Sequence, residues 1–381
     1  MRAIERLREV GIRRLGTPRT GFRYLRPDGR RVGRSELDRI RRLRIPPAWT
    51  EVHIAPLPAA KLQAIGRDRA GRVQYRYHPE FQKRTAAAKY RRLLRFAEAL
   101  PRLRAAVARD MRRRDLSRER VLAAMVRILD GCHMRPGSEA YARENGSFGL
   151  TTLRRHHVRL AGDLVVFDYR GKSGQRQVRE LRDRRVARLV RELLRVPGRD
   201  IFNFVEGGEV VDVRRRHLNG YLRAGSGAPF TAKDFRTWAG TLLCASELAR
   251  AAAAAPPGGA SSRRVAAKAA NAAVKAVAAK LGNTPAVARA SYISPAVLDG
   301  FVRGRTIACV LGDGEVLGRA AGGLHEAERA LLAFLRASAR RAPAPALRVV
   351  RGGLRERLRA TAPAGSTAKP FRRAARRAER D

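Results

Sequence analysis

Residues 281–295 read LGNTPAVARASYISP and carry two helix-start signals around one tyrosine. Thr284 can cap a helix through its hydroxyl, and Pro285 suits the first helical position. A Ser-Pro pair repeats this signal two residues after Tyr292. The spacing therefore predicts that Tyr292 lies on a short, sharply bounded helix with its phenol aimed by the bends on both sides. Most tyrosines only pack or hydrogen-bond, so the hypothesis that this phenol attacks a DNA phosphate needs supporting groups elsewhere in the chain.

The charge balance indicates a polyanionic partner. The chain has 381 residues, with 82 Lys and Arg against 34 Asp and Glu, a formal net charge of +48. Self-repulsion of this size favours nucleic acid, or an anionic membrane surface, as the partner. An apolar run of about 18 residues and a secretory signal pattern are both missing from the sequence, which disfavours the membrane. We therefore expect a cytoplasmic, nucleoid-associated protein that binds duplex DNA.

The cysteines and histidines suggest neither a metal nor a disulfide. Cys132, Cys244 and Cys309 lie far apart in helical or apolar surroundings, a spacing that builds neither a disulfide framework nor a zinc site. His156 and His157 are adjacent, and on a strand they would point to opposite faces. The expectation is a reducing cytoplasm and a site without a metal or other cofactor.

The N-terminal part of the chain predicts a basic lead followed by a small mixed, β-rich domain. Residues 1–18 are the basic lead. From 21 to about 81, short strands and turns are expected at GFRYL, PDGR, IPPAW, VHIAPL and LQAIGRDRAGRVQYRYHP. An alternating strand ends this part, and the side chains expected along a DNA groove or backbone are Arg72, Gln74, Tyr75 and Tyr77. An ordinary exposed strand is the alternative interpretation.

From about residue 84 the apolar spacing becomes helical. A pair of basic helices is predicted at 85–99 and 102–113, and Ser117 begins a third helix with a long apolar stripe. A three-stranded meander follows, with strands HHVRL, LVVFDY and QVREL and a tight loop at 171–174.

Further helices fill the rest of this part. They are expected at about 186–194 and 211–223, after the capping pair Thr231 and Asp234, and at 264–281. Residues 251–262 read as a flexible break, and the chain beyond about 340 reads as a disordered polybasic tail. The predicted domains are an N-terminal DNA-binding domain at 1–83, a catalytic domain at 84–340 and the tail at 341–381.

Two glycine-rich motifs are not nucleotide sites. Gly171-Lys172-Ser173 resembles the end of a P-loop, but the required earlier glycine is Val166 and the Lys lies between two strands. Residues 312–314 lack a dinucleotide fingerprint. Neither a paired-carboxylate pattern nor an HExxH pattern suggests a metal nuclease.

Attack of a tyrosine on a DNA phosphate without metal needs other groups. Fixed guanidinium groups can stabilise charge on the nonbridging oxygens, and a general acid must protonate the leaving sugar oxygen. Arg135, after the third helix, and Arg236, near a helix N-terminus where the dipole favours anions, are the candidate guanidinium groups. Lys172, at a hairpin tip in an arginine-rich chain, suits the acid, because an ammonium can lose its proton and a guanidinium practically cannot.

Taken together, the motifs resemble a bacterial (poxvirus-like) type IB DNA topoisomerase. The resemblance covers residues 20–305, about three quarters of the chain, in the order and spacing of the family. The stretches that carry it are GFRYL, IPPAW, GRDRAGRVQYRYHPEF, GSEAYARENGSFGLTTLRRHHV, FDYRGKSG, FTAKDFRTWAGT and LGNTPAVARASYISP.

This resemblance implies an α+β fold: a small β-rich N-terminal domain and a larger, mainly α-helical catalytic domain with a small antiparallel sheet, forming a clamp around DNA. By motif position it implies Tyr292 as nucleophile, Arg135 and Arg236 as transition-state arginines, and Lys172 as general acid. Asn283 stands where viral and eukaryotic relatives carry a His and where bacterial members are similar in having Asn; it can donate a hydrogen bond but cannot titrate. The implied DNA contacts are Gln74, Tyr75, Tyr77 and Tyr141, with Arg72 and Lys233 in support.

One motif departs from the family pattern. Around the first arginine the family usually has RxGN, whereas this chain has Arg135, Pro136, Gly137 and Ser138. The departure affects the expected local geometry rather than the role of the arginine.

The resemblance implies an ATP-independent and metal-independent monomer that relaxes supercoiled duplex DNA through a 3′-phosphotyrosyl intermediate, with no obligate protein partner. A tyrosine site-specific recombinase is one alternative, although recombinases usually carry His-x-x-Arg and Lys233 stands at the His position. A noncatalytic, nucleoid-type DNA-binding protein is the other, because charge alone would predict it.

Overall fold

The computed structural model describes residues 2–254, 263–311 and 323–341. In this part of the chain, helices are combined with small antiparallel sheets, which confirms the predicted α+β class. None of the helices in these ranges is long and apolar enough to cross a membrane.

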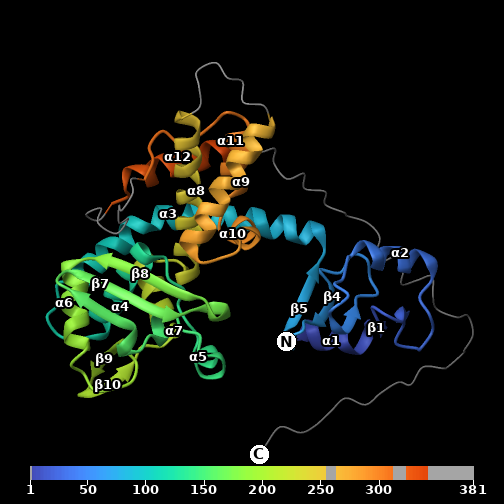
Figure 1. The fold of residues 1–381 in the computed structure, drawn as a ribbon, viewed down its shortest axis with the longest axis horizontal. Coiled ribbons are helices and arrows are strands. Elements are labelled where there is room, and N and C mark those ends of the chain that lie inside the picture. The colour runs from blue at the N-terminus through green and yellow to red at the C-terminus, as the bar shows by residue number, and fades with distance from the viewer. Residues whose placement is uncertain (1, 255–262, 312–322, 342–381) are drawn as a thin grey trace, which may run out of the picture. The chain divides into compact units, whose positions relative to one another are not determined.

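The N-terminal part contains a five-stranded antiparallel sheet with the order β2-β1-β3-β4-β5 (Figure 1). Its strands are β1 (Ile12–Thr17), β2 (Gly21–Leu25), β3 (Thr50–Ile54), β4 (Leu62–Arg67) and β5 (Val73–Tyr77). The IPPAW segment at 45–49 is a loop rather than a strand.

The basic lead, for which no element was predicted, forms regular secondary structure. Helix α1 (Arg2–Val10) and β1 occupy it, with Leu7 and Ile12 buried. Helix α2 (Arg34–Arg42), also unpredicted, buries Ile40 against the sheet. Arginine makes up three of the nine residues of α1 and four of the nine of α2, so each helix has only a short apolar stripe. Such a stripe is stable only when the sheet supplies a surface for it to cover.

The two faces of the sheet carry separate small cores. Ile40 of α2 packs with Ile54 and Ala64 on one face, whereas Leu7 of α1 packs with Ile65 on the other. Tyr75 pairs directly with Ile65 across β4 and β5, so it shares the α1 face.

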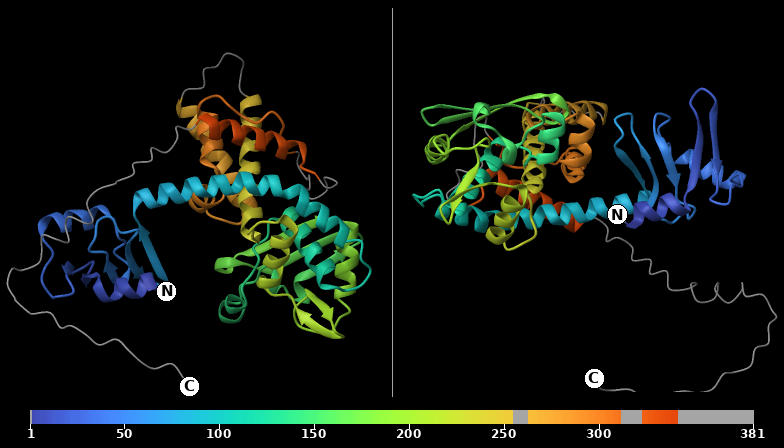
Figure 2. Two further views of the ribbon diagram at one scale, coloured as in Figure 1. Left: turned by 180° about the vertical axis from the view of Figure 1, so that it is seen from behind. Right: turned by 90° about the horizontal axis from the view of Figure 1, so that it is seen from below.

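A single long helix replaces the predicted pair. Helix α3 (Pro79–Asp110) begins at a His78 cap and runs through Pro101 without ending, and it is unbroken in the views of Figures 1 and 2. Proline removes one backbone hydrogen bond and normally ends or kinks a helix. Leu100 and Leu103 on either side are buried in the core, and this packing offsets the lost bond.

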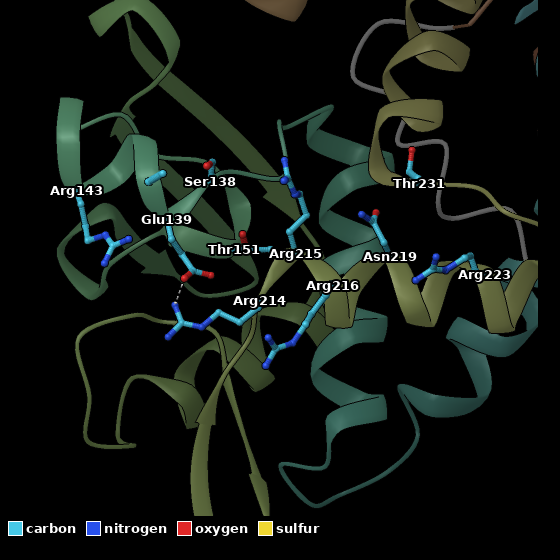
Figure 3. Close-up of a pocket in the computed structure, with 11 residues that line it drawn as sticks. Ser138, Glu139, Arg143, Thr151, Arg214, Arg215, Arg216, Asn219, Arg223 and Thr231 are labelled. Carbon is cyan, nitrogen blue, oxygen red and sulfur yellow. Dashed lines mark ion pairs between the residues drawn. The ribbon is translucent and has the colours of Figure 1, made fainter. Parts of the chain in front are cut away.

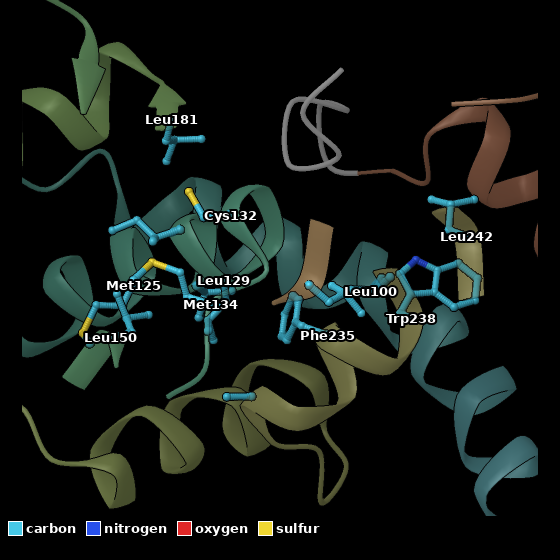
Figure 4. Close-up of a cluster of buried hydrophobic side chains, with 14 of the residues drawn as sticks. Leu100, Met125, Leu129, Cys132, Met134, Leu150, Leu181, Phe235, Trp238 and Leu242 are labelled. Atoms are coloured by element: carbon cyan, nitrogen blue, oxygen red, sulfur yellow. The ribbon is translucent and has the colours of Figure 1, made fainter. Parts of the chain in front are cut away.

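Helix α4 (Arg118–Cys132) is the centre of the large core. Its side chains pack with residues of α3, of the C-terminal helices and of the meander, as Figure 4 shows for Met125, Leu129 and Phe235. The helix ends at His133, whose backbone adopts the left-handed conformation.

The predicted meander is confirmed. It consists of β6 (Val158–Ala161), β7 (Leu164–Arg170) and β8 (Arg176–Arg182), followed by α6 (Arg184–Leu193). The paired histidines were predicted on the first strand, but they lie before it in a 3-10 turn, η2 (Arg155–His157). Their ring centroids are 4.2 Å apart, so they do not point to opposite faces.

A second hairpin was not predicted. It is formed by β9 (Asn203–Glu206) and β10 (Glu209–Asp212), and α7 (Arg215–Ser226) therefore starts later than the predicted 211. Short strands of this kind become recognisable only once they are paired.

The C-terminal helices mostly follow the prediction. The bounds are α8 (Ala232–Ala253), α9 (Arg263–Leu281), α10 (Pro285–Ser291), α11 (Pro295–Val302) and α12 (Glu326–Arg341). The capping pair is present, because Thr231 N donates to Asp234 Oδ2 at 2.8 Å. Residues 251–253 continue α8 instead of breaking the chain, whereas 255–262 and the tail at 342–381 lie outside the described residues.

The helix α12 belongs to the same core. Glu328 is fully buried and accepts hydrogen bonds from Arg104 of α3, at 2.6 and 3.0 Å, and from Trp238 Nε1 of α8, at 2.7 Å. A buried carboxylate is tolerated only when it is paired in this way.

Candidate active site

Tyr292 lies directly after α10. Thr284 Oγ1 accepts from Val287 N at 3.3 Å and begins the helix, and Tyr292 is its C-cap, one residue beyond the predicted position within the helix. Tyr292 N donates to Ala288 O at 2.9 Å, and Tyr292 O accepts from Thr241 Oγ1 of α8 at 3.1 Å. The backbone that carries the phenol is therefore held from two helices.

Arg236 of α8 is buried beside this phenol. Its Cζ lies 4.9 Å from the centroid of the Tyr292 ring. Nη1 donates to His133 O, and Nη2 donates to Leu281 O at 2.9 Å. Two backbone carbonyls from different segments thus hold the guanidinium group in one orientation.

Arg135 is held by the turn that follows α9. Its Nη2 donates to Gly282 O at 2.8 Å and to Asn283 Oδ1. Asn283 Nδ2 is buried and has no hydrogen-bond partner among the described residues. Such an unsatisfied donor is costly unless a ligand accepts from it, so Asn283 is ready to donate to an anion.

The segment around Arg135 is ordered despite its departure from the family motif. Arg135 O accepts from Leu150 N at 2.9 Å, and Pro136 O accepts from Thr151 N at 2.7 Å and from Thr151 Oγ1 at 2.8 Å. Gly137 has a φ of 94° and packs against Gly149, which leaves no room for a side chain. The extra proline therefore lies in a segment fixed by its neighbours.

The site is strongly cationic, and this changes the titration of the phenol. Burial raises the pKa of Tyr292, but the charge and hydrogen bonding of Arg236 and the charges of Arg135 and Lys233 together bring it below its usual value. Burial and the nearby positive charges lower the pKa of His133 to about 4, so its imidazole is neutral at pH 7. The environment therefore makes this phenol easier to ionise than an ordinary tyrosine.

Lys172 is placed differently. It is exposed in the loop between β7 and β8, in the short turn η3 (Lys172–Gly174), as the hairpin prediction required. Within the described ranges, no hydrogen bond or ion pair connects it to Tyr292 or to the arginines. The structure brings together Tyr292, Arg135, Arg236 and Asn283, and leaves Lys172 apart.

Gln177 of β8 is a site residue that the sequence did not reveal. A Cβ at Gly171, at the base of the Lys172 loop, would lie 2.7 Å from Gln177 Cγ, and a Cβ at Gly282 would lie 2.6 Å from Gln177 Oε1. Gln177 therefore lies between the hairpin and the turn that holds Arg135. Gln177 belongs to a strand in which polar and apolar residues alternate in the usual way, so the sequence did not indicate that it lies beside the site.

The chemistry of the cluster is that of an oxyanion site. One guanidinium group lies against a phenol with a lowered pKa, a second acts on it through its charge, and an amide is hydrogen-bonded to that second group. This arrangement suits a phosphodiester under attack. Among the described residues, three or more His, Cys, Asp or Glu side chains nowhere gather into a metal-binding group.

Comparisons with known proteins agree with this chemistry. Residues 78–297 match the family described as "Eukaryotic DNA topoisomerase I, catalytic core", and residues 21–68 match "Bacterial DNA topoisomerase IB, N-terminal domain". The chain is also 33% identical to the DNA topoisomerase 1B of Acanthamoeba polyphaga mimivirus over 275 residues, which cover 71% of this chain and 81% of the viral protein. The chain belongs to the type IB DNA topoisomerases. It is therefore an isomerase that acts on DNA, as the resemblance implied.

In this topoisomerase the predicted DNA contacts occupy different surfaces. Tyr75 and Tyr77 are exposed on β5 with stacked rings whose centroids are 6.1 Å apart. Gln74 lies on the opposite face of the strand and donates to Asp68 Oδ2 at 2.9 Å, and Arg72 forms an ion pair with the same carboxylate. Both side chains are therefore engaged with Asp68.

The other two predicted contacts lie near the catalytic cluster in sequence. Tyr141 is 57% exposed on α5 (Glu139–Asn145), the short helix that follows the Arg135 segment. Lys233 is exposed in the first turn of α8, three residues before Arg236. Both side chains are thus exposed to solvent.

An arginine-lined hollow of the topoisomerase was missed by the sequence reasoning. It has a volume of about 880 Å³ and lies between α5 and the start of α7 (Figure 3). Its cationic side chains are Arg143, Arg214, Arg215, Arg216 and Arg223. Arg214 forms an ion pair within the hollow, with Glu139 at 3.0 Å, and among the described residues the other four have no ion pair there. The run of three arginines at 214–216 was the available signal, but it was hidden by the abundance of arginine elsewhere.

Proposed function

We propose that this topoisomerase relaxes supercoiled duplex DNA by transient cleavage of one strand, with Tyr292 as nucleophile. The Tyr292 phenol loses its proton to solvent, its oxygen forms a bond to phosphorus, the bond to the 5′ oxygen breaks, and a 3′-phosphotyrosyl ester remains. The free 5′-hydroxyl strand rotates about the intact strand and then attacks the ester to reseal the nick. Because the ester conserves the bond energy, the reaction requires no ATP, and because the guanidinium groups stabilise the developing charge, it requires no metal.

The observation that carries this proposal is the position of Arg236 and Arg135 around the Tyr292 phenol. In the proposed mechanism both guanidinium groups stabilise the nonbridging oxygens as charge develops on them. Asn283 adds one neutral hydrogen bond through its unpartnered Nδ2.

Lys172 is the proposed general acid. It gives a proton to the departing 5′ oxygen and takes it back when that oxygen attacks. Since the Lys172 loop is exposed, bound DNA would bring the ammonium group and the scissile phosphate together.

Duplex DNA is the proposed substrate of a monomer. Residues 1–83 and 84–340 are proposed as the two halves of a clamp, with contacts from Arg72, Gln74, Tyr75, Tyr77, Tyr141 and Lys233. We add the arginine-lined hollow, whose exposed guanidinium groups suit backbone phosphates. Such contacts make binding strongly dependent on salt.

A relaxation assay in EDTA without ATP tests the mechanism. The wild-type protein should relax supercoiled plasmid and leave a covalent protein–DNA adduct that maps to Tyr292. The variant Tyr292→Phe should bind DNA with the same salt dependence but neither relax it nor form the adduct. Relaxation by this variant would refute the assignment, and recombinant joints formed by the wild type would favour a recombinase.

A further inference from the structure

The last carbonyls before Tyr292 are held by a lysine from a distant part of the chain. Lys89 of α3 donates from Nζ to Ala290 O at 3.3 Å and to Ser291 O. These are the last two residues of α10, and Tyr292 follows immediately. Lys89 therefore contacts the backbone that carries the proposed nucleophile, although it is about 200 residues away in sequence.

Helix α10 needs such a partner. It has seven residues, too few for a helix to be stable by its own hydrogen bonds. The carbonyls of its last turn lack partners within the helix and carry the negative end of its dipole. An ammonium group at this end satisfies two carbonyls and opposes the dipole at once.

The position of Lys89 is unfavourable for a lysine that has no role. The side chain is half-buried, and burial together with the charge of Lys233 lowers its pKa to about 8. A cation that loses hydration beside another cation is stabilised only by specific acceptors. The acceptors here are the α10 carbonyls.

Contacts from α9 and α8 hold the rest of this backbone: Arg289 of α10 donates to Asn271 Oδ1 of α9 at 2.8 Å. Thr241 Oγ1 donates to Tyr292 O at 3.1 Å, and a Cβ at Gly240 would lie 3.0 Å from Tyr292 Cβ. Contacts from α8 thus fix Tyr292 itself, while Lys89 fixes the residues just before it. Removing either set weakens the hold on the backbone that carries the phenol.

We propose that Lys89 is a positioning residue that fixes the end of α10 and thereby places the Tyr292 phenol for in-line attack. The inference rests on the proposed function of Tyr292. It assigns Lys89 no contact with DNA and no proton transfer. Because a small displacement of a reacting group can cost up to about 100-fold in rate, the effect should appear in the chemical step.

Single-turnover cleavage of a duplex substrate separates positioning from binding. Lys89→Met should slow formation of the covalent adduct by about 10- to 100-fold and slow religation by a similar factor, while DNA affinity changes by less than about threefold. Arg91→Met is the matched control, because Arg91 is exposed on the same helix and carries the same charge. It should cleave at the wild-type rate.

A conservative series completes the test. Lys89→Arg keeps a cationic donor and should recover most of the rate, whereas Lys89→Gln keeps a donor without charge and should be intermediate. These variants also serve if Lys89→Met does not fold. Wild-type cleavage by Lys89→Met or Lys89→Gln, equal losses of binding and cleavage, or a Lys89→Arg variant no faster than Lys89→Gln would overturn the inference.

The experiment distinguishes failure of the proposed function from failure of the positioning role of Lys89. If the wild-type protein itself forms no adduct at Tyr292, the function is refuted. If the wild type forms the adduct and the Lys89 variants form it equally fast, only the positioning role is refuted.

Discussion

The arginine cluster around Tyr292 and the hairpin tip that carries Lys172 differ in how firmly they are held. Arg236 and Arg135 each donate to main-chain carbonyls, and Arg236 is buried. Lys172 is exposed in a loop, and in the described part of the chain it has no hydrogen bond or ion pair. The arginine cluster is therefore held in place by the main chain, whereas the Lys172 side chain is exposed to solvent.

This difference suggests a division of labour in the proposed mechanism. Groups that stabilise charge work best when they are oriented before the reaction, because no free energy is then spent on reorganising them. A proton donor that was fixed beside the cationic cluster would be repelled by it and would lose its proton too early. Keeping Lys172 apart until DNA neutralises the site avoids this conflict.

The largest expected effect on cleavage comes from changing Arg236 in the arginine cluster. Arg236→Ala should slow single-turnover cleavage by about 10³-fold, because it removes a preoriented donor to the transition state. Arg236→Lys keeps the charge but cannot hold both carbonyls, so it should be slower than wild type by about 10²-fold. A lysine variant with wild-type cleavage would show that the carbonyl contacts do not matter.

The next largest effect on cleavage comes from changing the exposed Lys172. Lys172→Ala should slow cleavage by about 10²-fold, and Lys172→Arg should be equally slow, because a guanidinium does not release its proton. A substrate whose leaving group is a 5′ thiol needs no protonation and should restore the rate of both variants, but not that of Arg236→Ala. Efficient cleavage of the ordinary substrate by Lys172→Arg would contradict the acid role.

A smaller effect on cleavage is expected at Gly282, which lies between Gln177 of the hairpin and the turn that holds Arg135. Gly282 has a φ of 61°, and a Cβ there would lie 2.6 Å from Gln177 Oε1. Gly282→Ala should lower the free energy of unfolding by about 1–2 kcal/mol through backbone strain and should slow cleavage by about tenfold through displaced Arg135. Gly162→Ala is the control, since its φ of 60° is matched but its Cβ would meet nothing within 4 Å. It should lose stability, as measured by urea unfolding, without losing cleavage activity.

The smallest expected effect is a shift in the pH at which Tyr292 ionises. Because the net effect of the cationic cluster is to lower the pKa of Tyr292, the difference in tyrosinate absorbance between wild type and Tyr292→Phe should appear below pH 10 in the absence of DNA. Between that lowered pKa and 10, the unfolded chain binds more protons, so the wild type should gain stability with rising pH relative to the variant. A difference signal centred at or above pH 10 would mean that burial outweighs the arginines.

Local signals predicted much of the fold. The Thr284-Pro285 start, the Thr231 capping pair and the alternation of the meander depend on neighbouring residues, and the structure contains all three. Elements with short apolar stripes in arginine-rich surroundings were missed, including α1, and α3 was wrongly divided. Their stability comes from surfaces that distant segments supply, which a local pattern does not contain.

The sequence by itself determined the charge, the order of the motifs and the chemical types available to the site: a phenol, two guanidinium groups, an amide and one hairpin ammonium group. Only the tertiary structure decided that the turn after α9 holds Arg236 and Arg135 together, that Asn283 keeps a donor free, and that Lys89 holds the end of α10. These contacts join segments up to about 200 residues apart. They exist because packing of the core brings backbone carbonyls next to side chains that need acceptors.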